Sequence, residues 1–272
     1  TPAYFAPDPE FCRTFRVLLR KEEKDLMKII AMIPARYDSS RFEGKMLADL
    51  CGKPVIARTY DAAVATGLFD QVYVVTDHDG IEQAVKANGG QVLRSHKHHE
   101  TGSDRIAEAV EGIDCDIVVN VQGDEPFVTR EPLEKLIGVF SGPDAQRIDL
   151  ASMVQELKQP ELIADPNYVK VVMDHRNFAM YLSRSPIPYL RDKDSGARYY
   201  EHVGVYAFRR QSLLDFAKNA PRQNERAEKI ECIRYLEYGL HIKMVEAPFV
   251  SLEIDTPQDL KAACALFRKL HG

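Results

Sequence analysis

The first half of the chain alternates short apolar segments with segments of helical character, and this alternation restricts the possible folds strongly. The apolar run from Met27 to Ile33 ends in a loop that contains proline, as a buried parallel strand would. The same pattern predicts strands at residues 71–76, 91–94 and 116–121, and helices at residues 54–65, 80–87, 104–110 and 131–140. Regular alternation of this kind is typical of a three-layer α/β domain with a largely parallel sheet.

The pattern changes after Pro143, where predicted strands succeed one another without long helices between them. Residues 148–154, 168–173 and 178–183 indicate an antiparallel arm inserted around residues 148–200. The remainder predicts strands at residues 201–208 and 242–245 and helices at residues 211–218, at about 227–238 and from Thr256 onward. We therefore expect one continuous domain over residues 27–272 with an inserted arm.

The first 26 residues differ in character from the rest of the chain. They lack the apolar core of a signal peptide, because their longest apolar run is short and interrupted by charge. We interpret residues 1–26 as an N-terminal extension outside the catalytic domain and Met27 as a plausible natural start.

Composition excludes several classes of protein. The chain carries 36 Lys and Arg against 41 Asp and Glu, a net charge of −5, which has the wrong sign for general nucleic-acid binding. No apolar run approaches the roughly 18 residues of a membrane-spanning helix, so no membrane insertion is expected. Five scattered cysteines without a CxxC pair argue against a disulfide framework and fit a reducing, cytoplasmic location.

A basic loop comes directly after the first predicted strand. It holds Arg36, Arg41 and Lys45 among small and turn-forming residues, and Gly44 allows a close approach of its backbone. Loops at the carboxyl ends of parallel strands are where α/β sheets bind ligands, and arginine and lysine suit phosphate oxygens. The loop is no Walker loop, because GxxxxGK[ST] is absent. A merely solvated basic loop is the alternative.

Two acidic residues stand just beyond predicted strands. Asp124 comes after the strand at 116–121 and a glycine, and Asp255 precedes a predicted helix near the carboxyl terminus. Thr256 and Asp259 are explained as the N-cap and third residue of that helix, whereas Asp255 does not need to be acidic for the cap. Together with the basic loop, the pair predicts a magnesium-dependent nucleotidyl-transfer site. Each carboxylate alone could instead be a turn or cap residue.

These segments resemble motifs of the 3-deoxy-manno-octulosonate (KDO) cytidylyltransferases, also called CMP-KDO synthetases. The basic loop resembles P-A-R-x-x-S-x-R-x-x-G-K, and Asn120 to Pro126 resembles N-V-Q-G-D-E-P. Further matching segments occur in the family order: Thr76–His78, Gly102–Arg105, Val169–Val172, Ser183–Arg184, His202–Tyr206 and Asp255–Pro257. One departure is G-S-D-R at Gly102–Arg105 in place of G-T-E-R, which keeps the chemistry. The resemblance extends from Met27 to the carboxyl terminus.

The resemblance implies a mixed αβα sandwich of the nucleotide-diphospho-sugar transferase type, with an arm used in homodimer formation. It implies transfer of CMP from CTP to KDO with release of pyrophosphate, which activates KDO for lipopolysaccharide synthesis. It assigns Asp124 and Asp255 to Mg²⁺ and counts them with Lys45 as catalytic. It assigns to CTP the residues Arg36, Arg41, Lys45, Ser103, Arg105 and Gln122, and to the sugar the residues Gln122, Arg184, His202, Tyr206 and Glu231.

The chemistry of KDO fits this sugar-side set. Arg184 suits the sugar carboxylate, and His202 and Tyr206 share one face of a predicted strand because they are four residues apart. Each also has a purely structural explanation, His202 as a strand histidine on a polar face and Tyr206 as a core aromatic.

Other functions fit less well. A sialic acid cytidylyltransferase is the nearest alternative, because its substrate also carries a carboxylate. A nicotinamide-dependent oxidoreductase would need GxGxxG after the first strand, where Pro34-Ala35-Arg36 stands. A nucleotide sensor without activity would leave the paired carboxylates unexplained. The histidines His96, His98 and His99 are not spaced like a tetrahedral metal site, and we interpret them as part of a polar loop.

Overall fold

The computed structural model describes residues 27–39, 41–97, 99, 101–192, 194–247 and 252–271. The N-terminal extension expected at residues 1–26 lies outside these ranges. Within them, no helix combines the length and the apolar character needed to cross a membrane.

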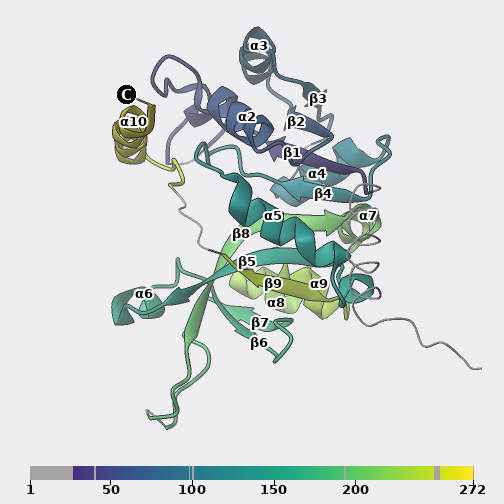
Figure 1. Cartoon of the computed structure of the whole chain (residues 1–272), viewed down its shortest axis with the longest axis vertical. Coiled ribbons are helices and arrows are strands. Elements are labelled where there is room, and N and C mark those ends of the chain that lie inside the picture. The colour runs from purple at the N-terminus through teal and green to yellow at the C-terminus, as the bar shows by residue number, and fades with distance from the viewer. Residues whose placement is uncertain are drawn as a thin grey trace, which may run out of the picture.

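A twisted sheet forms the centre of the molecule (Figure 1). Its main path has the order β3-β2-β1-β4-β8-β5-β9. The strands of this path are β1 (Ile29–Pro34), β2 (Gln71–Thr76), β3 (Val92–Arg94), β4 (Ile117–Asn120), β5 (Leu150–Leu157), β8 (Tyr199–Arg209) and β9 (Ile242–Glu246). All neighbours are parallel except for β8, which is antiparallel to both β4 and β5. The expected mixed, largely parallel sheet is thus confirmed.

Helices cover both faces of the sheet, because alternate residues of each buried strand point to opposite sides. Ile29, Ala31 and Ile33 of β1 pack in one core cluster with residues of α2, α3 and α5. Ile30 and Met32 belong to a second cluster with residues of α4, α7 and α9. The helices concerned are α2 (Val55–Ala65), α3 (Asp79–Ala87), α4 (Gly102–Val110), α5 (Arg130–Gly138), α7 (Arg210–Lys218) and α9 (Ile233–Glu237). The expected αβα sandwich is therefore present.

The expected arm begins later than residue 148. β5 lies inside the main sheet, between β8 and β9, so its first residues are core rather than insertion. The projecting part consists of the antiparallel pair β6 (Lys170–Met173) and β7 (Ala179–Ser183), the short helix α6 (Pro160–Ala164) and the ends of β5 and β8 (Figure 1). Strand patterning could not separate core from insertion here, because a sheet that mixes directions needs no helix between neighbouring strands.

The single helix expected near residues 227–238 is two short helices, α8 (Gln223–Glu228) and α9. Lys229 separates them in the left-handed conformation (φ 54°), where its N–H donates to the carbonyl of Glu225 at 2.8 Å. The helix expected to end at Phe140 stops at Gly138 and continues as 3₁₀-helix η2 (Val139–Ser141), and a further 3₁₀-helix, η3 (Ala145–Arg147), precedes β5. Glu231 lies in the short connection between this break and α9.

The ends of β1 and β4 define that edge. The two strands are parallel and in register, with Met32 opposite Asn120, so the loops after them leave the sheet side by side. The carboxyl-terminal helix α10 (Pro257–His271) is preceded by an extended segment that reaches the same edge. Three regions distant in sequence therefore meet where α/β sheets bind ligands.

Candidate active site

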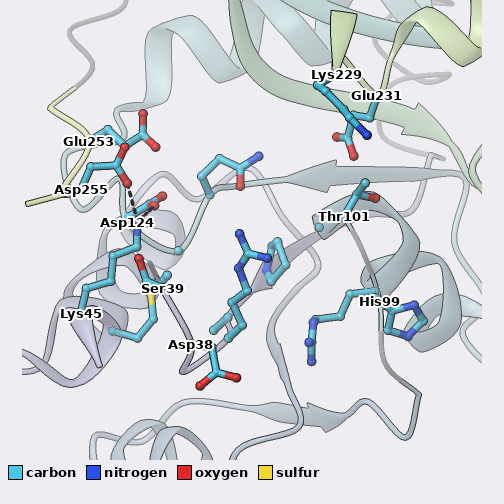
Figure 2. A pocket seen from close by; sticks show the side chains of 18 of the residues that line it. Asp38, Ser39, Lys45, His99, Thr101, Asp124, Lys229, Glu231, Glu253 and Asp255 are labelled. Carbon is cyan, nitrogen blue, oxygen red and sulfur yellow. Dashed lines mark hydrogen bonds and ion pairs between the residues drawn. The ribbon is translucent and has the colours of Figure 1, made fainter. Parts of the chain in front are cut away.

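A cavity of about 1360 Å³ opens at this edge of the sheet. Its walls come from the loops after β1 and β4, the start of α4, the α8–α9 region and the segment before α10 (Figure 2). Most of the residues expected to bind substrates or metal line it: Arg36, Arg41, Lys45, Arg105, Gln122, Asp124, Glu231 and Asp255. The cavity is large enough for two substrates, since pockets for one small ligand typically measure about 300–1,000 Å³.

The basic loop is shaped by Gly44, which adopts the left-handed conformation (φ 68°) before 3₁₀-helix η1 (Lys45–Leu47). A side chain at Gly44 would be strained by this φ, and its Cβ atom would also lie only 3.3 Å from the Tyr37 hydroxyl, so the position favours glycine. Tyr37 is itself held by stacking on His78, with 4.2 Å between ring centroids. The turn directs Lys45 inward, and the residue is only 8% exposed.

Lys45 joins the two expected metal ligands. Its Nζ lies 2.5 Å from Oδ2 of Asp124 and 2.7 Å from Oδ1 of Asp255 (Figure 2). Burial alone would lower the pKa of Lys45, but the two carboxylates outweigh it and raise that pKa above its usual value. Arg41 adds a second cation, with Nη2 2.5 Å from Oδ2 of Asp255. The structure thus brings together four residues that the sequence analysis assigned to one candidate site.

The segment before α10 is fixed to the loop after β4 through its backbone. The N–H of Ile254 donates to the carbonyl of Asp124 at 3.0 Å, and the Ile254 side chain is fully buried beside Leu50. Thr256 and Asp259 cap the helix reciprocally, as expected: Thr256 N–H donates to the Asp259 carboxylate at 2.7 Å, and Asp259 N–H donates to the Thr256 hydroxyl at 3.2 Å. The Asp255 carboxylate takes no part in this cap and faces the cavity.

Glu253 is a site residue that the sequence reasoning missed. Carboxylate oxygens of Asp124, Glu253 and Asp255 lie within 4.8 Å of one another. The pKa of Glu253 is raised to about 7, mainly because the carboxyl is partly buried and secondly because the charges of Asp124 and Asp255 repel its ionised form. Its spacing of two from Asp255 on an extended segment was the available signal, since alternate residues share a side. Clustered carboxylate oxygens suit a hard divalent cation such as Mg²⁺, so this donor set fits the metal that the resemblance implies.

The opposite wall carries hydrogen-bonding groups that are held in place. Arg105 is buried and contacts both oxygens of Asp77, at 3.0 and 3.1 Å. Although partial burial acts in the opposite direction, Arg105 holds the pKa of Asp77 below its usual value. Ser103 does not line the cavity. Its hydroxyl donates to Oε1 of Glu231 at 2.8 Å and so holds the carboxyl of Glu231, which does line the cavity. Burial raises the pKa of Glu231.

Three of the expected sugar-binding residues, Arg184, His202 and Tyr206, do not line the cavity. The guanidinium of Arg184 donates to the carbonyls of Glu228 at 2.6 Å, Pro166 at 2.9 Å and Lys229 at 3.3 Å. It therefore braces the turn between α8 and α9 instead of facing a substrate. A spacing pattern cannot reveal this, because the carbonyls that occupy Arg184 come from distant segments.

His202 and Tyr206 share one face of β8, as expected, but that face is covered. Their rings lie 5.7 Å apart, and His202 Nε2 is 2.9 Å from the Ser152 hydroxyl on β5. Both residues are less than 10% exposed. Tyr206 is therefore a core aromatic, as its structural explanation states, whereas His202 is buried against β5 and lies neither on a polar face nor at the cavity.

We expect His202 to make stability depend on pH. Burial lowers the pKa of His202 from 6.5 to about 4, so between these values the unfolded chain binds a proton that the folded protein excludes. Above pH 6.5 this difference in proton binding has no effect on stability. As the pH falls from 6.5 to about 4, it lowers the free energy of unfolding by up to about 3 kcal/mol. His202→Gln can keep a hydrogen bond to Ser152 and does not titrate. Urea unfolding from about pH 7 to about pH 4 should therefore show a shallower loss in the variant. Parallel pH curves would contradict the prediction.

His99 also lines the cavity, a placement that the sequence reasoning missed. Its Nε2 lies 2.7 Å from Glu108, which also accepts from the Ser95 hydroxyl at 2.8 Å and from His96 N–H. Burial acts the other way, but these donors hold the pKa of Glu108 at about 2. His98, the third histidine of that loop, lies outside the described residues.

Known proteins resemble this chain over most of its length. The profile of the cytidylyltransferase family matches residues 30–243. The 3-deoxy-manno-octulosonate cytidylyltransferase of Flavobacterium johnsoniae is 55% identical over 244 residues, which cover 90% of this chain and all of the relative. That of Christiangramia forsetii is 57% identical over 242 residues, 89% of this chain and 98% of the relative.

Solved structures agree with these sequences. A structure described as CMP:2-keto-3-deoxy-manno-octonic acid synthetase complexed with CTP superposes with a TM-score of 0.83 at 37% identity, covering 89% of this chain and 99% of the other. A 4-diphosphocytidyl-2C-methyl-D-erythritol synthase from Anaerococcus prevotii gives a TM-score of 0.60 at 17% identity, which shows a shared fold alone. Because the profile, the relatives and the first structure coincide, the chain belongs to the cytidylyltransferase family, among the 3-deoxy-manno-octulosonate cytidylyltransferases.

Proposed function

We propose that the protein transfers CMP from CTP to the anomeric 2-hydroxyl of KDO. The hydroxyl oxygen attacks the α-phosphorus, the bond from that phosphorus to the bridging oxygen of the β-phosphate breaks, and pyrophosphate leaves. The hydroxyl proton is released. The cluster of Lys45, Arg41, Asp124 and Asp255 at the carboxyl edge of the sheet is the observation that carries this proposal. It combines cations for a polyphosphate with carboxylates for a divalent cation, as phosphoryl transfer requires.

The loop after β1 supplies the phosphate side. Arg36 is exposed at the cavity wall and forms no ion pair with another described residue, so its guanidinium is available to phosphate oxygens. Arg41 and Lys45 face the same space from the other end of the loop. The three cations would hold the triphosphate and offset the charge that gathers on the leaving pyrophosphate.

Asp124 and Asp255 would hold Mg²⁺, with Glu253 beside them. A bound divalent cation polarises phosphate oxygens and lowers the pKa of a coordinated hydroxyl. A cation that activates the hydroxyl in this way does not require a separate side chain as general base. The residues of the chain contribute by binding and orienting the two substrates against each other.

On the sugar side, Gln122 and Glu231 face the cavity and offer mixed donors and acceptors for hydroxyl groups. Gln122 is oriented by donating to the Gly204 carbonyl at 3.1 Å, and Glu231 by the Ser103 hydroxyl. Arg184 would act on this pocket indirectly, through the turn that carries Lys229 and Glu231.

We also propose that the protein forms a homodimer through its projecting arm. The arm, together with the loop that joins β7 to β8, exposes large apolar side chains: Met180 of β7 at 65% and Tyr189 of the loop at 88%. Exposed apolar side chains on a projecting element support a protein–protein contact.

An assay of pyrophosphate release with CTP and a panel of 2-keto sugar acids tests the proposed function. We expect release with KDO and Mg²⁺, and little release without a sugar acid or with sialic acid. The expected preference for KDO over sialic acid is at least tenfold in kcat/KM, or about 1.4 kcal/mol. A reversed preference would reassign the enzyme to sialic acid, and no release with any acid would contradict the proposal.

A further inference from the structure

The two expected metal ligands are already occupied by cations of the protein. Of their four carboxylate oxygens, Asp124 Oδ2 and Asp255 Oδ1 contact Lys45, and Asp255 Oδ2 contacts Arg41. The side chain of Lys45 is 9% exposed, so water does little to weaken its two contacts. The ammonium group lies between the carboxylates that a divalent cation would bridge.

We propose that Lys45 occupies the place of the divalent cation in the nucleotide-free protein, and that the cation binds tightly only together with CTP. This inference rests on the proposed function and adds an order of binding to it. When CTP arrives, its triphosphate offers Lys45 and Arg41 new anionic partners. The two side chains turn to the phosphates, and the carboxylates become free for the cation.

Charge balance supports this exchange. A divalent cation that entered without nucleotide would have to share Asp124 and Asp255 with two positive side chains, because Lys45 and Arg41 already pair with both carboxylates. Glu253 adds one further carboxyl beside them. With CTP present, the phosphates carry enough negative charge to accept Lys45 and Arg41 together. Each partner then gains an opposite charge without leaving a buried one unpaired.

The local structure allows Lys45 to move. Lys45 begins a 3₁₀-helix of only three residues, directly after the left-handed Gly44, and its long side chain has several rotatable bonds. Arg41 is exposed at 65%, so its contact with Asp255 is screened and easily exchanged. Arg36 lines the cavity without an ion partner among the described residues and offers incoming phosphates a first contact.

Binding of Mn²⁺, measured by electron paramagnetic resonance without nucleotide, tests the proposal. Lys45→Met keeps the length of the side chain but removes its charge, and we expect it to bind Mn²⁺ at least tenfold more tightly than the wild type. Lys45→Arg keeps the charge and should stay weak. Arg36→Met removes a cation from the same cavity that touches neither carboxylate, and it should also leave Mn²⁺ affinity unchanged. In the double variant Lys45→Met/Asp124→Asn the gain should disappear, which places it at this cluster.

The same measurement on the wild type keeps the test decisive if Lys45→Met does not fold, as judged by circular dichroism. A CTP analogue with a methylene bridge between the α- and β-phosphates itself chelates Mn²⁺, so its affinity for Mn²⁺ free in solution is measured first. With the analogue, the wild type should bind Mn²⁺ at least tenfold more tightly than either the protein or the analogue alone, and Asp124→Asn should lose this gain. A wild-type affinity no tighter than that of the free analogue, or no gain in folded Lys45→Met, would overturn the proposal. These outcomes are independent of catalysis, whereas failure of the proposed function would appear as wild-type protein that makes no CMP-linked sugar.

Discussion

Asp124→Asn and Asp255→Asn are each expected to lower kcat by at least about 10³-fold, equivalent to roughly 4 kcal/mol of transition-state stabilisation. The amide keeps the shape of the side chain but removes the charge needed to bind a divalent cation next to the triphosphate. Each variant leaves Lys45 with one carboxylate partner, so the fold should be little affected. Steady-state kinetics at saturating Mg²⁺, together with thermal unfolding, measures both effects.

Asp259→Asn is the matched control for these variants. Asp259 lies four residues from Asp255 on the same segment but caps α10 and does not line the cavity. Its replacement should change stability by about 1 kcal/mol or less and leave turnover within a few-fold of the wild type. Turnover close to that of the wild type in Asp124→Asn or Asp255→Asn would remove that residue from the catalytic site.

Arg234→Met is expected to lower the free energy of unfolding by about 3–5 kcal/mol, because it leaves a buried carboxylate without its partner. Arg234 contacts both oxygens of Glu225, at 2.6 and 2.8 Å, and the exposed fractions of the two side chains are 4% and 8%. Its guanidinium lies 3.9 Å from the centroid of the Phe216 ring and donates to the carbonyl of Asn219. Both members of the pair form part of the cavity wall, so activity should fall as well. Urea unfolding measures the loss of stability.

Two further variants separate the pair from the general effect of removing an arginine. Arg226→Met replaces an exposed cation of the same wall that has no ion partner among the described residues, and it should change stability by only about 0.5 kcal/mol. Glu225→Gln/Arg234→Met removes both buried charges and should be less destabilised than Arg234→Met alone. A loss below about 1 kcal/mol in Arg234→Met would show that the pair contributes little to the fold.

The sequence predicted the parts of the fold that depend on local periodicity. The strand expected at residues 71–76 coincides with β2. The strands expected at residues 27–33 and 116–121 differ from β1 and β4 by one or two residues at each end. The convergence of Lys45 and Asp124 was predictable as well, because the carboxyl ends of adjacent parallel strands meet at one edge. The strand expected at residues 148–154 was assigned to the inserted arm, whereas β5 belongs to the main sheet. Its position between β8 and β9 depends on pairing between residues far apart in the chain.

Side-chain partners were less accessible to prediction than backbone elements. An arginine such as Arg184 serves a substrate carboxylate and backbone carbonyls equally well, and only the tertiary structure shows that carbonyls of three other residues occupy it. The burial of His202 depends on the pairing of β8 with β5, which its own segment does not encode. Glu253 lies beside Asp124 because the neighbouring Ile254 N–H donates to the Asp124 carbonyl, a contact between distant segments that the local sequence does not encode.

The most direct test of the proposed function is to monitor CTP and KDO with the wild-type protein and Mg²⁺ by phosphorus NMR. We expect the CTP signals to be replaced by pyrophosphate and a CMP phosphodiester in equal amounts, with the phosphodiester dependent on KDO. Formation of free CMP without the sugar-linked phosphodiester, or persistence of CTP, would contradict the assignment of this cavity to CMP transfer.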